Sequence, residues 1–579
     1  MDRAALVVQG NKMEIQKKIE EKIIAVLKEL SINAESVVLE HPDELSHGDY
    51  STNVAMVHAK QQGMRPRDLA EKIVAKLTEL KNFGELVDIS KIEIAGPGFI
   101  NFHMSPEFFH DSVKKIAEGK TGTSGLLSGK KIFFEYTQPN PFKEFHIGHM
   151  MNNMIGEAVS RTLEFAGAEV KRATYHGDVG LHVAKTIWGI RKLELKELTV
   201  KDLGRAYATG NTAYEDDSQA KEEIVEINKK VYEKSDKEIN NLYEEGRKIS
   251  FEEFERLYKL LGSHFDFHFL ESEAGPVGKE IVLKNCAAGI FVQSEGAVVF
   301  KGEEYDKSLH TRVFINKEGL PTYEAKEIGL AELKDTAFPS DYMVTVTANE
   351  QDSFFRVVKK AIELLFPKYE KRIVHLSHGM LKLPSGKMSS RTGTVISAET
   401  LISEVEEKVK EKIKDRNFDD ATAQDVVSKV SLGALRYSIL RQAIGGDIIF
   451  DFEKSVSFDG DSGPYLQYAC VRAQSIIEKA RAENIGGELK TAPASVSNLE
   501  KILYRFPEIA ERGALEYQPH HIVTYLIELA GEFNSYYAHN KIIGVGDPTS
   551  AYKVKLTAAF VCVMKEGLKL LGIEVPARM

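Results

Sequence analysis

Two histidines three residues apart, His146 and His149, flank a glycine in the segment "HIGH". Paired imidazoles of this kind can bind a metal ion, donate hydrogen bonds to phosphate oxygens, or lie solvated in an ordinary loop at a helix start. A metal site needs further ligands at suitable spacing, and the sequence has no third histidine or cysteine close by. The phosphate site and the ordinary loop therefore remain as the two interpretations.

A second segment, "LKLPSGKMSSRTGTV" at 381–395, places Lys387 and Arg391 among hydroxyl side chains beside a glycine. Such cations bind phosphate well, although a loop of this composition taken alone is more often a solvated surface loop. The segment at 119–130 resembles a phosphate-binding Walker loop only superficially, because Ser124 stands where its first glycine belongs. We interpret 119–130 as a linker between domains.

The elements around "HIGH" predict how it is positioned. "KIFFEY" at 131–136 has the character of a buried strand, 148–165 has helical spacing, and a second strand-like run ends at "ATYHGD". This order predicts a βαβ unit in a parallel sheet. Ligands bind such sheets at the carboxyl ends of the strands, where helix N-termini attract anions. Gly148 at that helix start would let the backbone approach a ligand closely.

The remainder of the chain predicts further domains, since 579 residues are too many for one hydrophobic core. Residues 12–32 carry the apolar stripe of an amphipathic helix. Residues 195–275 are charged and helical in pattern, which predicts an insertion. From about residue 400 onward nearly everything has helical periodicity.

Composition narrows the functional classes. The chain is 43% hydrophobic and 28% charged, and no apolar run approaches the ~20 residues that span a bilayer. The first residues lack a secretory signature, so we expect neither a membrane segment nor secretion. The widely spaced Cys286, Cys470 and Cys562 argue against disulfides and a cysteine zinc site, and favour a reducing cytoplasm. The net charge of -10 does not indicate a nucleic-acid partner, although it can conceal a local basic surface.

Together, "HIGH" after the first strand and "KMSSR" on a late loop resemble the paired signature of class I aminoacyl-tRNA synthetases. Within that class, the chain resembles the arginyl-tRNA synthetase family over nearly its full length. The ordered series that carries this likeness comprises "HGDYSTNVAM" (47–56), "AGPGFINFHMS" (95–105), "QPNPFKEFHIGH" (138–149), "YHGDVGLH" (175–182), "LPTYEAKEIGLA" (320–331), "DGDSGPYLQYACVRAQSI" (459–476) and "KLLGIEVPARM" (569–579).

The resemblance implies an α/β fold: a Rossmann-type, parallel-sheet catalytic domain at 126–400 with a helical insertion at about 195–275. It also implies an α+β N-terminal domain at 1–120 that binds tRNA, a helical connecting region at 401–455 and an all-α anticodon-binding bundle at 456–579. The motif "HGDYSTN" either contacts tRNA or forms a structural turn. A monomeric, cytoplasmic protein is the usual case in this family.

The implied activity is that of an arginine–tRNA ligase. ATP activates arginine to arginyl-adenylate, and the arginyl group then passes to the 3′ end of tRNA(Arg). Relatives usually need tRNA for the first step. Mg²⁺ accompanies ATP, but no carboxylate cluster dedicated to it is visible. By resemblance, the catalytic residues are Lys143, His146, His149, Lys387 and Arg391, and the further ATP-binding residues are Gly148, Met388, Ser389 and Ser390.

The second signature departs from the common "KMSKS". Ser390 stands where the second lysine belongs, and Arg391 where the final serine belongs. In this family a lysine just before "HIGH" often replaces the missing cation, and Lys143 occupies that place. Lys143 and Arg391 are therefore competing candidates for the same role, since a guanidinium also suits phosphate.

Arginine recognition requires a planar acidic partner, because a carboxylate accepts two parallel N–H bonds from a guanidinium. Citrulline would leave a buried carboxylate unpaired, and should be rejected without an editing domain. By resemblance, the arginine-binding residues are Glu135, Asn140, Asp178, Tyr323, Glu327 and Gln351. The chain departs from the family pattern at four positions in this region: Glu327 for aspartate, Lys326 for arginine, His182 for glutamine and Phe354 for histidine.

In the C-terminal bundle, Tyr465, Tyr468, Arg472 and Lys541 are the candidate tRNA-binding residues, since RNA loops stack on aromatic rings and pair with cations. Tyrosines at helical spacing are also common in cores. Two rival hypotheses remain. Another "HIGH"-bearing nucleotidyltransferase would not need tRNA-binding modules at both ends. A synthetase-like RNA- or partner-binding protein without catalysis stays open because of Ser390.

Overall fold

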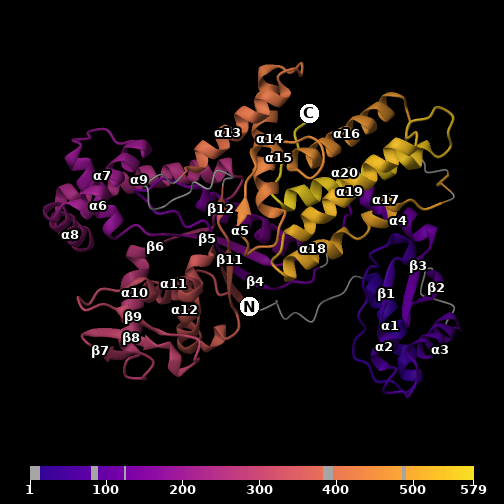
Figure 1. Ribbon diagram of the computed structural model, residues 1–579, viewed down its shortest axis with the longest axis horizontal. Coiled ribbons are helices and arrows are strands. Elements are labelled where there is room, and N and C mark those ends of the chain that lie inside the picture. The colour runs from indigo at the N-terminus through magenta and orange to yellow at the C-terminus, as the bar shows by residue number, and fades with distance from the viewer. Residues whose placement is uncertain (1–13, 80–88, 123–124, 383–395, 486–490, 494) are drawn as a thin grey trace.

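The computed structural model describes residues 14–79, 89–122, 125–382, 396–485, 491–493 and 495–579. Figure 1 shows an N-terminal domain and a C-terminal group of helices side by side on the right, a central parallel sheet, and two further lobes on the left. In that view the upper left lobe is all helical, and the lower one contains a small antiparallel sheet.

The N-terminal domain is an antiparallel sheet packed with helices. Its strands, β1 (Tyr50–Thr52), β2 (Ile89–Ala95) and β3 (Phe99–Met104), are ordered β1-β3-β2. Its helices are α1 (Glu14–Glu29), α2 (Val54–His58) and α3 (Pro66–Glu79), and α4 (Pro106–Ala117) follows β3 and packs against the C-terminal helices. The predicted amphipathic helix is confirmed as α1, whose Ile19, Ile23 and Leu27 are fully buried.

The motif "HGDYSTN" has a structural role in this domain. Asp49 accepts a hydrogen bond from the backbone N–H of Met104. Tyr50, His41 and Gln16 all reach the carboxylate of Glu508 in the C-terminal helices, at 2.5, 2.9 and 2.7 Å. Through Asp49 the motif closes the domain, and through Tyr50, together with His41 and Gln16, it docks the domain against the C-terminal region.

The central sheet is parallel, with the strand order β11-β10-β4-β5-β6. Its strands are β4 (Lys131–Glu135), β5 (Glu169–His176), β6 (Phe267–Leu270), β10 (Tyr342–Ala348) and β11 (Ile373–His378). Helix α5 (Ile147–Phe165) connects β4 to β5, as the βαβ pattern predicted. Adjacent residues of β4 face opposite sides, because Phe134 lies in the core shared with α5 whereas Phe133 lies in the core on the other face.

The two faces of the sheet are covered differently. On one face, α5 packs into a core that it shares with the C-terminal helices. On the other, α10 (Glu271–Lys284), α11 (Tyr323–Ala337) and α12 (Asp352–Leu365) form a second core. This second lobe also carries an antiparallel sheet of β7 (Val292–Ser294), β8 (Ala297–Lys301) and β9 (Thr311–Ile315), which the sequence patterns do not predict.

Four helices follow β5 and form the helical lobe with its own core. They are α6 (Leu181–Lys192), α7 (Val200–Asp216), α8 (Ser218–Glu233) and α9 (Lys237–Leu260). Gly189 and Gly210 allow α6 and α7 to pack backbone to backbone, since a Cβ at either would lie about 2 Å from a carbonyl oxygen of the partner helix. This helical insertion occupies 181–260, slightly earlier than its predicted range.

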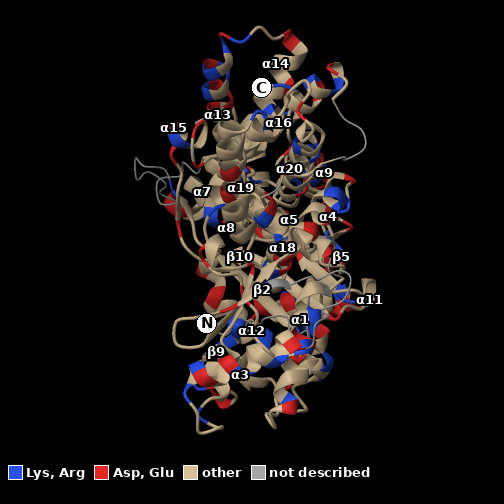
Figure 2. Cartoon of the chain, turned by 90° about the vertical axis from the view of Figure 1, so that its right-hand side faces the viewer, with Lys and Arg blue, Asp and Glu red and all other residues tan. Residues whose placement is uncertain are grey.

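Among the described residues from Ala398 onward, the elements are helices apart from one strand, β13 (Ile448–Ile449), which pairs with β12 (Leu381–Lys382). The helices are α13 (Ala398–Ile413), α14 (Asp420–Leu440), α15 (Phe452–Ser455), α16 (Gly463–Ala482), α17 (Asn498–Leu503), α18 (Phe506–Leu515), α19 (His520–His539) and α20 (Ser550–Leu570). Short 3-10 turns lie at 45–47, 302–304, 349–351 and 367–369. Figure 2 shows both signs of charge interspersed on elements such as α13. Across the described residues, no helix has the length and apolarity that crossing a bilayer requires.

Candidate functional site

The "HIGH" histidines form the N-terminal cap of α5. His146 Nδ1 accepts hydrogen bonds from the N–H groups of Gly148 (3.1 Å) and His149 (3.4 Å), and the His146 N–H donates to His149 Nδ1 (3.2 Å). The two rings stack with centroids 3.6 Å apart. Because each Nδ1 is an acceptor, each neutral ring carries its proton on Nε2, where it can act as a donor.

Electrostatics keep these rings uncharged. Burial, together with the nearby Lys143 ammonium, lowers the pKa of His146 to about 4. Burial and then His146 lower the pKa of His149 well below its ordinary value. Gly148 is required here, since a Cβ on it would lie 2.9 Å from the His146 ring. The pair is therefore a set of neutral hydrogen-bond donors at a helix N-terminus, which suits an anion.

The loop that leads from β4 into α5 has a constrained backbone. Thr137, Gln138 and Phe142 all have positive φ angles, of 79°, 49° and 66°. Such angles are costly for residues with a side chain and persist only where the surroundings enforce them. Asn152 accepts from the Thr137 N–H at 2.7 Å, and the Ser250 hydroxyl accepts from the Phe142 N–H at 3.0 Å.

A cavity of about 620 Å³ opens at the carboxyl ends of the central strands. Strand ends, the start of α5, α11 and the start of α12 all contribute to its wall. The lining residues are Glu135, Thr137, Gln138, Asn140, Lys143, His146, Ile147, Gly148, His149, Met151, Asn152, Tyr175, Gly177, His182, Glu271, Tyr323, Glu327, Thr347, Ala348, Glu350, Gln351, Phe354, Phe355, His378, Gly379, Met380 and Leu381. A position at the ends of parallel strands is the usual ligand site of this architecture.

The part of the cavity over β4, β5 and β6 is acidic. Glu271 pairs with Lys326 at 2.5 Å, and Glu135 pairs with Lys334; all four side chains are buried. Glu327 has no ion-pair partner among the residues that the structure describes. Burial first, and then the Glu135 carboxylate, raise the pKa of Glu327 to about 8. This half of the cavity thus holds one more carboxylate than ammonium, which suits a cationic ligand.

On the other side of the cavity, Lys143 carries a positive charge without a carboxylate. Within the described part of the chain, its ammonium makes no ion pair and instead contacts the ring face of Tyr207, 4.9 Å from the centroid. Burial lowers the pKa of Lys143 from its ordinary value. A half-buried cation in this condition is suited to pair with an anionic ligand.

The other predicted arginine-binding residues divide into two groups. Asn140, Tyr323 and Gln351 line the cavity. Asn140 Oδ1 accepts from the Gly177 N–H at 3.2 Å, and Tyr323, at the start of α11, is 64% exposed. Asp178 does not line the cavity.

Asp178 is fully buried beside the cavity, and its carboxylate is occupied by protein donors. It accepts hydrogen bonds from the N–H (2.9 Å) and hydroxyl (2.7 Å) of Ser272 and from the hydroxyl of Tyr243 (2.8 Å). These partners join the turn after β5 to α10 and α9. The geometry therefore gives Asp178 a structural task in holding the turn after β5, and its role as an arginine ligand stays a prediction.

Among the cavity residues that sequence reasoning missed, two carry unpartnered polar atoms. The Tyr175 hydroxyl and His378 Nε2 are buried and have no hydrogen-bond partner among the described residues. His378 uses Nδ1 on the carbonyl of Gly379 at 2.7 Å, so its free Nε2 is an acceptor. Buried polar atoms are rarely unpartnered, and such atoms in a cavity wall point to a ligand. Tyr175 sits in the segment "YHGDVGLH", which was the one signal that the sequence offered for it.

The second signature segment falls outside the described residues, and with it Lys387, Met388, Ser389, Ser390 and Arg391. The residues that flank it are described. Leu381 lines the cavity, and the Ile147 N–H of "HIGH" donates to the Ile396 carbonyl at 3.2 Å. The Ala398 N–H in turn donates to the Phe145 carbonyl at 3.0 Å. Both sides of the segment are thus fixed beside the histidine pair.

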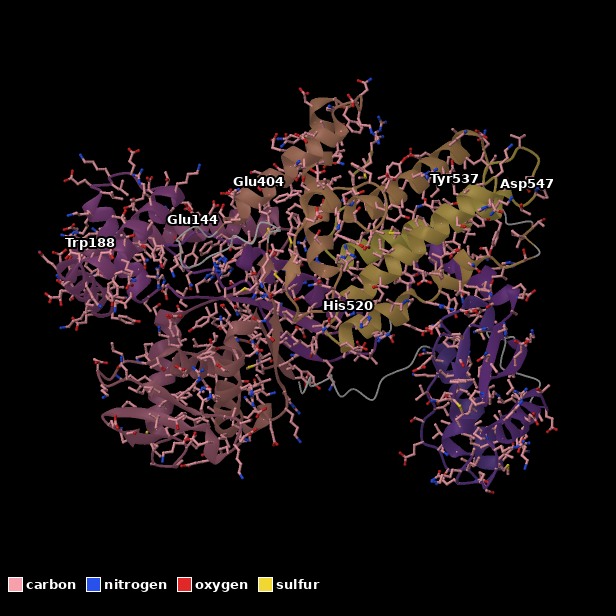
Figure 3. All side chains as sticks on the ribbon, in the orientation of Figure 1. Glu144, Trp188, Glu404, His520, Tyr537 and Asp547 are labelled. Atoms are coloured by element: carbon pink, nitrogen blue, oxygen red, sulfur yellow. The ribbon has the colours of Figure 1, made fainter. Side chains whose placement is uncertain are left out.

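The candidate tRNA-binding residues lie in the C-terminal helices. Arg472 places its guanidinium 4.5 Å from the ring centroid of Tyr537, and Tyr465 accepts from Asn534 at 2.9 Å. Tyr468 is half-buried on α16, and Lys541 is exposed after α19. Figure 3 shows Tyr537 and Asp547 at the far end of these helices, on the opposite side of the molecule from Trp188 in the helical insertion.

Comparison with protein families gives three consecutive matches. Residues 13–104 match the family "Arginyl tRNA synthetase N terminal domain", and residues 466–579 match "DALR anticodon binding domain". Between them, residues 113–452, more than half of the chain, match "tRNA synthetases class I (R), catalytic domain".

Similar proteins match over the whole length. An arginine–tRNA ligase of Borrelia hermsii is 30% identical over 593 residues, covering 98% of this chain and 100% of the relative. One of Fusobacterium nucleatum is 30% identical over 545 residues, covering 92% and 93%. The arginyl-tRNA synthetase structures of Thermus thermophilus and Plasmodium falciparum share the fold, with TM-scores of 0.79 and 0.80 at 22% and 19% identity. They cover 97% and 98% of this chain, and 100% and 99% of their own.

Proposed function

The chain belongs to the arginyl-tRNA synthetase family, and we propose that its central cavity holds arginine over β4, β5 and β6 and ATP over β10 and β11. The chain is an ATP-dependent arginine–tRNA ligase. Within that reaction, the acidic and the basic side of the cavity have different tasks.

One observation carries the assignment. The same cavity wall contains a carboxylate, Glu327, and an ammonium, Lys143, and neither has an ion-pair partner among the described residues. Ionisable groups that are shielded from water and lack a partner are costly, and they are retained where a ligand completes them. Arginyl-adenylate formation brings together a guanidinium and a phosphate chain, which are the two opposite charges that this wall lacks.

On the arginine side, Glu327 receives the guanidinium, and Glu135, which Lys334 already balances, is a secondary acceptor beside it. The Tyr175 hydroxyl, buried and unpartnered among the described residues, is a further group for it to contact. Asn140, Tyr323 and Gln351 bind the rest of the amino acid, as the family resemblance implies. Asp178 supports the wall through Ser272 and Tyr243. Citrulline lacks the positive charge and leaves Glu327 unpaired, so it is rejected.

On the phosphate side, the Nε2–H groups of His146 and His149 donate to phosphate oxygens, and Lys143 supplies positive charge. Fixed donors in a water-poor cavity stabilise charge that develops in the transition state without having to reorganise. Lys143 takes the role of the missing signature lysine. Lys387, Met388, Ser389, Ser390 and Arg391 are expected to complete the site from the second signature.

The nucleoside occupies the remaining wall, formed by His378, Gly379, Met380 and Leu381. Mg²⁺ accompanies the triphosphate. Within the described residues no group of three or more histidine, cysteine or acidic side chains is arranged to hold a metal ion. Mg²⁺ is accordingly expected to be bound mainly by phosphate oxygens and water, which is its common mode with nucleotides.

The two terminal regions bind tRNA(Arg). The N-terminal domain contacts the body of the tRNA, and the C-terminal helices contact the anticodon through Tyr465, Tyr468, Arg472 and Lys541. The boundaries proposed for these parts are 1–120, 126–400, 401–455 and 456–579. The protein acts as a cytoplasmic monomer, as is usual in the family, and light scattering on a size-exclusion column tests the monomer directly.

Transfer of radiolabelled arginine to total tRNA tests the proposal and separates the rival hypotheses. We expect acid-insoluble label only when ATP and tRNA are both present, and none from labelled citrulline. A small-molecule nucleotidyltransferase would leave tRNA unlabelled while still consuming nucleotide. A protein without catalysis would retain tRNA on a filter and transfer nothing.

A further inference from the structure

The ammonium of Lys143 is held by an aromatic ring that belongs to the helical insertion. Its Nζ lies 4.9 Å from the centroid of the Tyr207 ring. Lys143 stands in the loop between β4 and α5, three residues before His146, whereas Tyr207 is a half-buried residue of α7. Two segments more than sixty residues apart in the sequence thus meet at Lys143. Among the described residues, Lys143 is the one cationic side chain that lines the phosphate side of the cavity.

An aromatic ring suits this position in a way that a carboxylate would not. The negative face of the ring attracts the ammonium, yet the ring does not neutralise its charge or compete strongly for its N–H donors. A carboxylate partner would neutralise the charge of the ammonium and accept its N–H hydrogen bonds. Lys143 therefore stays charged, oriented and free to pair with an incoming phosphate, although burial opposes its charge.

The insertion holds Tyr207 firmly. Gly189 of α6 lies against the backbone of Ala206, next to Tyr207, so closely that a Cβ would lie 2.0 Å from the Ala206 carbonyl oxygen. One turn earlier, Gly204 packs against the carboxylate of Glu144, the neighbour of Lys143. Figure 3 labels Glu144 where the loop meets the insertion. These contacts fix the position of the Tyr207 ring relative to the loop that carries Lys143.

We propose that Tyr207 is a positioning residue for arginine activation, which holds the Lys143 ammonium toward the phosphates of ATP. The inference rests on the proposed role of Lys143. It also gives the helical insertion a direct part in the first reaction step, through one side chain.

Variants at position 207 separate this role from simple packing. Tyr207→Phe keeps the ring, and Tyr207→Leu keeps apolar bulk without a π face. Tyr214→Leu is the matched control, because Tyr214 on the same helix also contacts lysines, Lys185 and Lys221. Unlike Lys143, these lysines line no part of the cavity. The assay is arginine-dependent ATP–pyrophosphate exchange with tRNA(Arg) present, and thermal unfolding accompanies each variant.

We expect Tyr207→Leu to lower kcat about 5- to 30-fold, the loss that removal of one partly desolvated cation–π contact produces. The KM for arginine should stay unchanged. The alkaline limb of the pH profile should move to lower pH, because an ammonium without its ring loses its proton more easily. Tyr207→Phe and Tyr214→Leu should behave like the wild type.

If Tyr207→Leu fails to fold, fluorinated phenylalanines at position 207 weaken the ring face at nearly constant shape, and kcat should fall stepwise with fluorination. In a Lys143→Met background, Tyr207→Leu should add little. Lys143→Met with full activity would overturn the assigned role of Lys143 and the inference with it. Two other results would overturn the inference about Tyr207 while leaving the role of Lys143 intact. In the first, Lys143→Met lowers kcat but Tyr207→Leu is no slower than Tyr214→Leu. In the second, Tyr207→Phe and Tyr207→Leu lower kcat equally.

Discussion

Glu327 and Lys143 line one cavity, and neither charge has an ion-pair partner among the described residues. Their carboxylate and ammonium come from α11 and from the loop after β4. The other acidic residues of the cavity's arginine side are balanced, Glu271 by Lys326 and Glu135 by Lys334. The free protein therefore retains one carboxyl group, Glu327, and one ammonium group, Lys143, without an ion-pair partner among the described residues on these two sides of the cavity, and arginine and ATP complete them when they enter together.

Arginine binding should release a proton near neutral pH. Burial and Glu135 raise the pKa of Glu327 to about 8, so most of this carboxyl is protonated at pH 7, and the guanidinium binds its ionised form. Affinity should rise with pH up to about 8 and level off above it. Calorimetry in buffers of different ionisation enthalpy measures the released proton.

The variant Glu327→Gln tests how Glu327 affects the pH dependence of folding stability. Between pH 4.5, the ordinary pKa of a glutamate, and about pH 8, the folded protein binds more protons at Glu327 than the unfolded chain does. The free energy of unfolding therefore falls as the pH rises through this range. Glu327→Gln should remove that loss and also the arginine affinity, whereas Glu318→Gln on an exposed turn should change neither. A pH-independent arginine affinity in the wild type would contradict the assignment.

Two replacements of His146 should separate its cap from its donor. An asparagine at this position can still cap α5 through its side-chain oxygen but lacks the imidazole Nε2–H, so His146→Asn should fold normally and lose about 100-fold in kcat. His146→Ala should lose the same rate and about 1 kcal/mol of stability as well. Pyrophosphate exchange and thermal unfolding measure the two effects, and a fully active His146→Asn would refute the donor role.

Asp178→Asn should affect stability before it affects substrate binding. Its carboxylate accepts from Ser272 and Tyr243, and an amide cannot accept from all three of their donors without presenting its own N–H groups to one. The melting temperature should fall, while the KM for arginine changes little at a permissive temperature. Asp216→Asn, at an exposed helix end, is the control. An increased KM with an unchanged melting temperature would return Asp178 to the arginine ligands.

Lys541→Ala should weaken tRNA binding without touching arginine activation. The exposed ammonium is expected to contact phosphate, so its loss should flatten the dependence of tRNA affinity on salt by about one unit of slope. Lys317→Ala, on an exposed turn of the catalytic domain, serves as the control. Filter binding across a salt series measures both. Equal slopes in the wild type and Lys541→Ala would remove Lys541 from the proposed interface.

The sequence predicted the parts of the site that local pattern determines. The strand at 131–136, the helix after "HIGH" and the strand ending at "ATYHGD" are confirmed as β4, α5 and β5, because apolar periodicity and glycine position specify them. The clustering of "HIGH", Tyr323 and Glu327 at one edge followed from the parallel sheet together with the family resemblance.

Long-range pairing could not be predicted in the same way. Whether a carboxylate is free or paired depends on which helix packs against which strand. Glu135 is paired with Lys334, whereas Glu327 has no ion-pair partner among the described residues, and the sequence does not show this difference. Asp178 lies in the same segment as Tyr175, yet only the packing of α9 and α10 shows that its oxygens are occupied. The contact of Lys143 with Tyr207 likewise depends on how the insertion folds back.

Steady-state pyrophosphate exchange by two single variants, with tRNA(Arg) present, tests the central claim most directly. Glu327→Gln should raise the KM for arginine and leave the KM for ATP near the wild-type value. Lys143→Met should lower kcat and leave the KM for arginine unchanged. If both variants alter the same parameter, or if neither slows exchange, then the cavity does not divide its charges between arginine and phosphate.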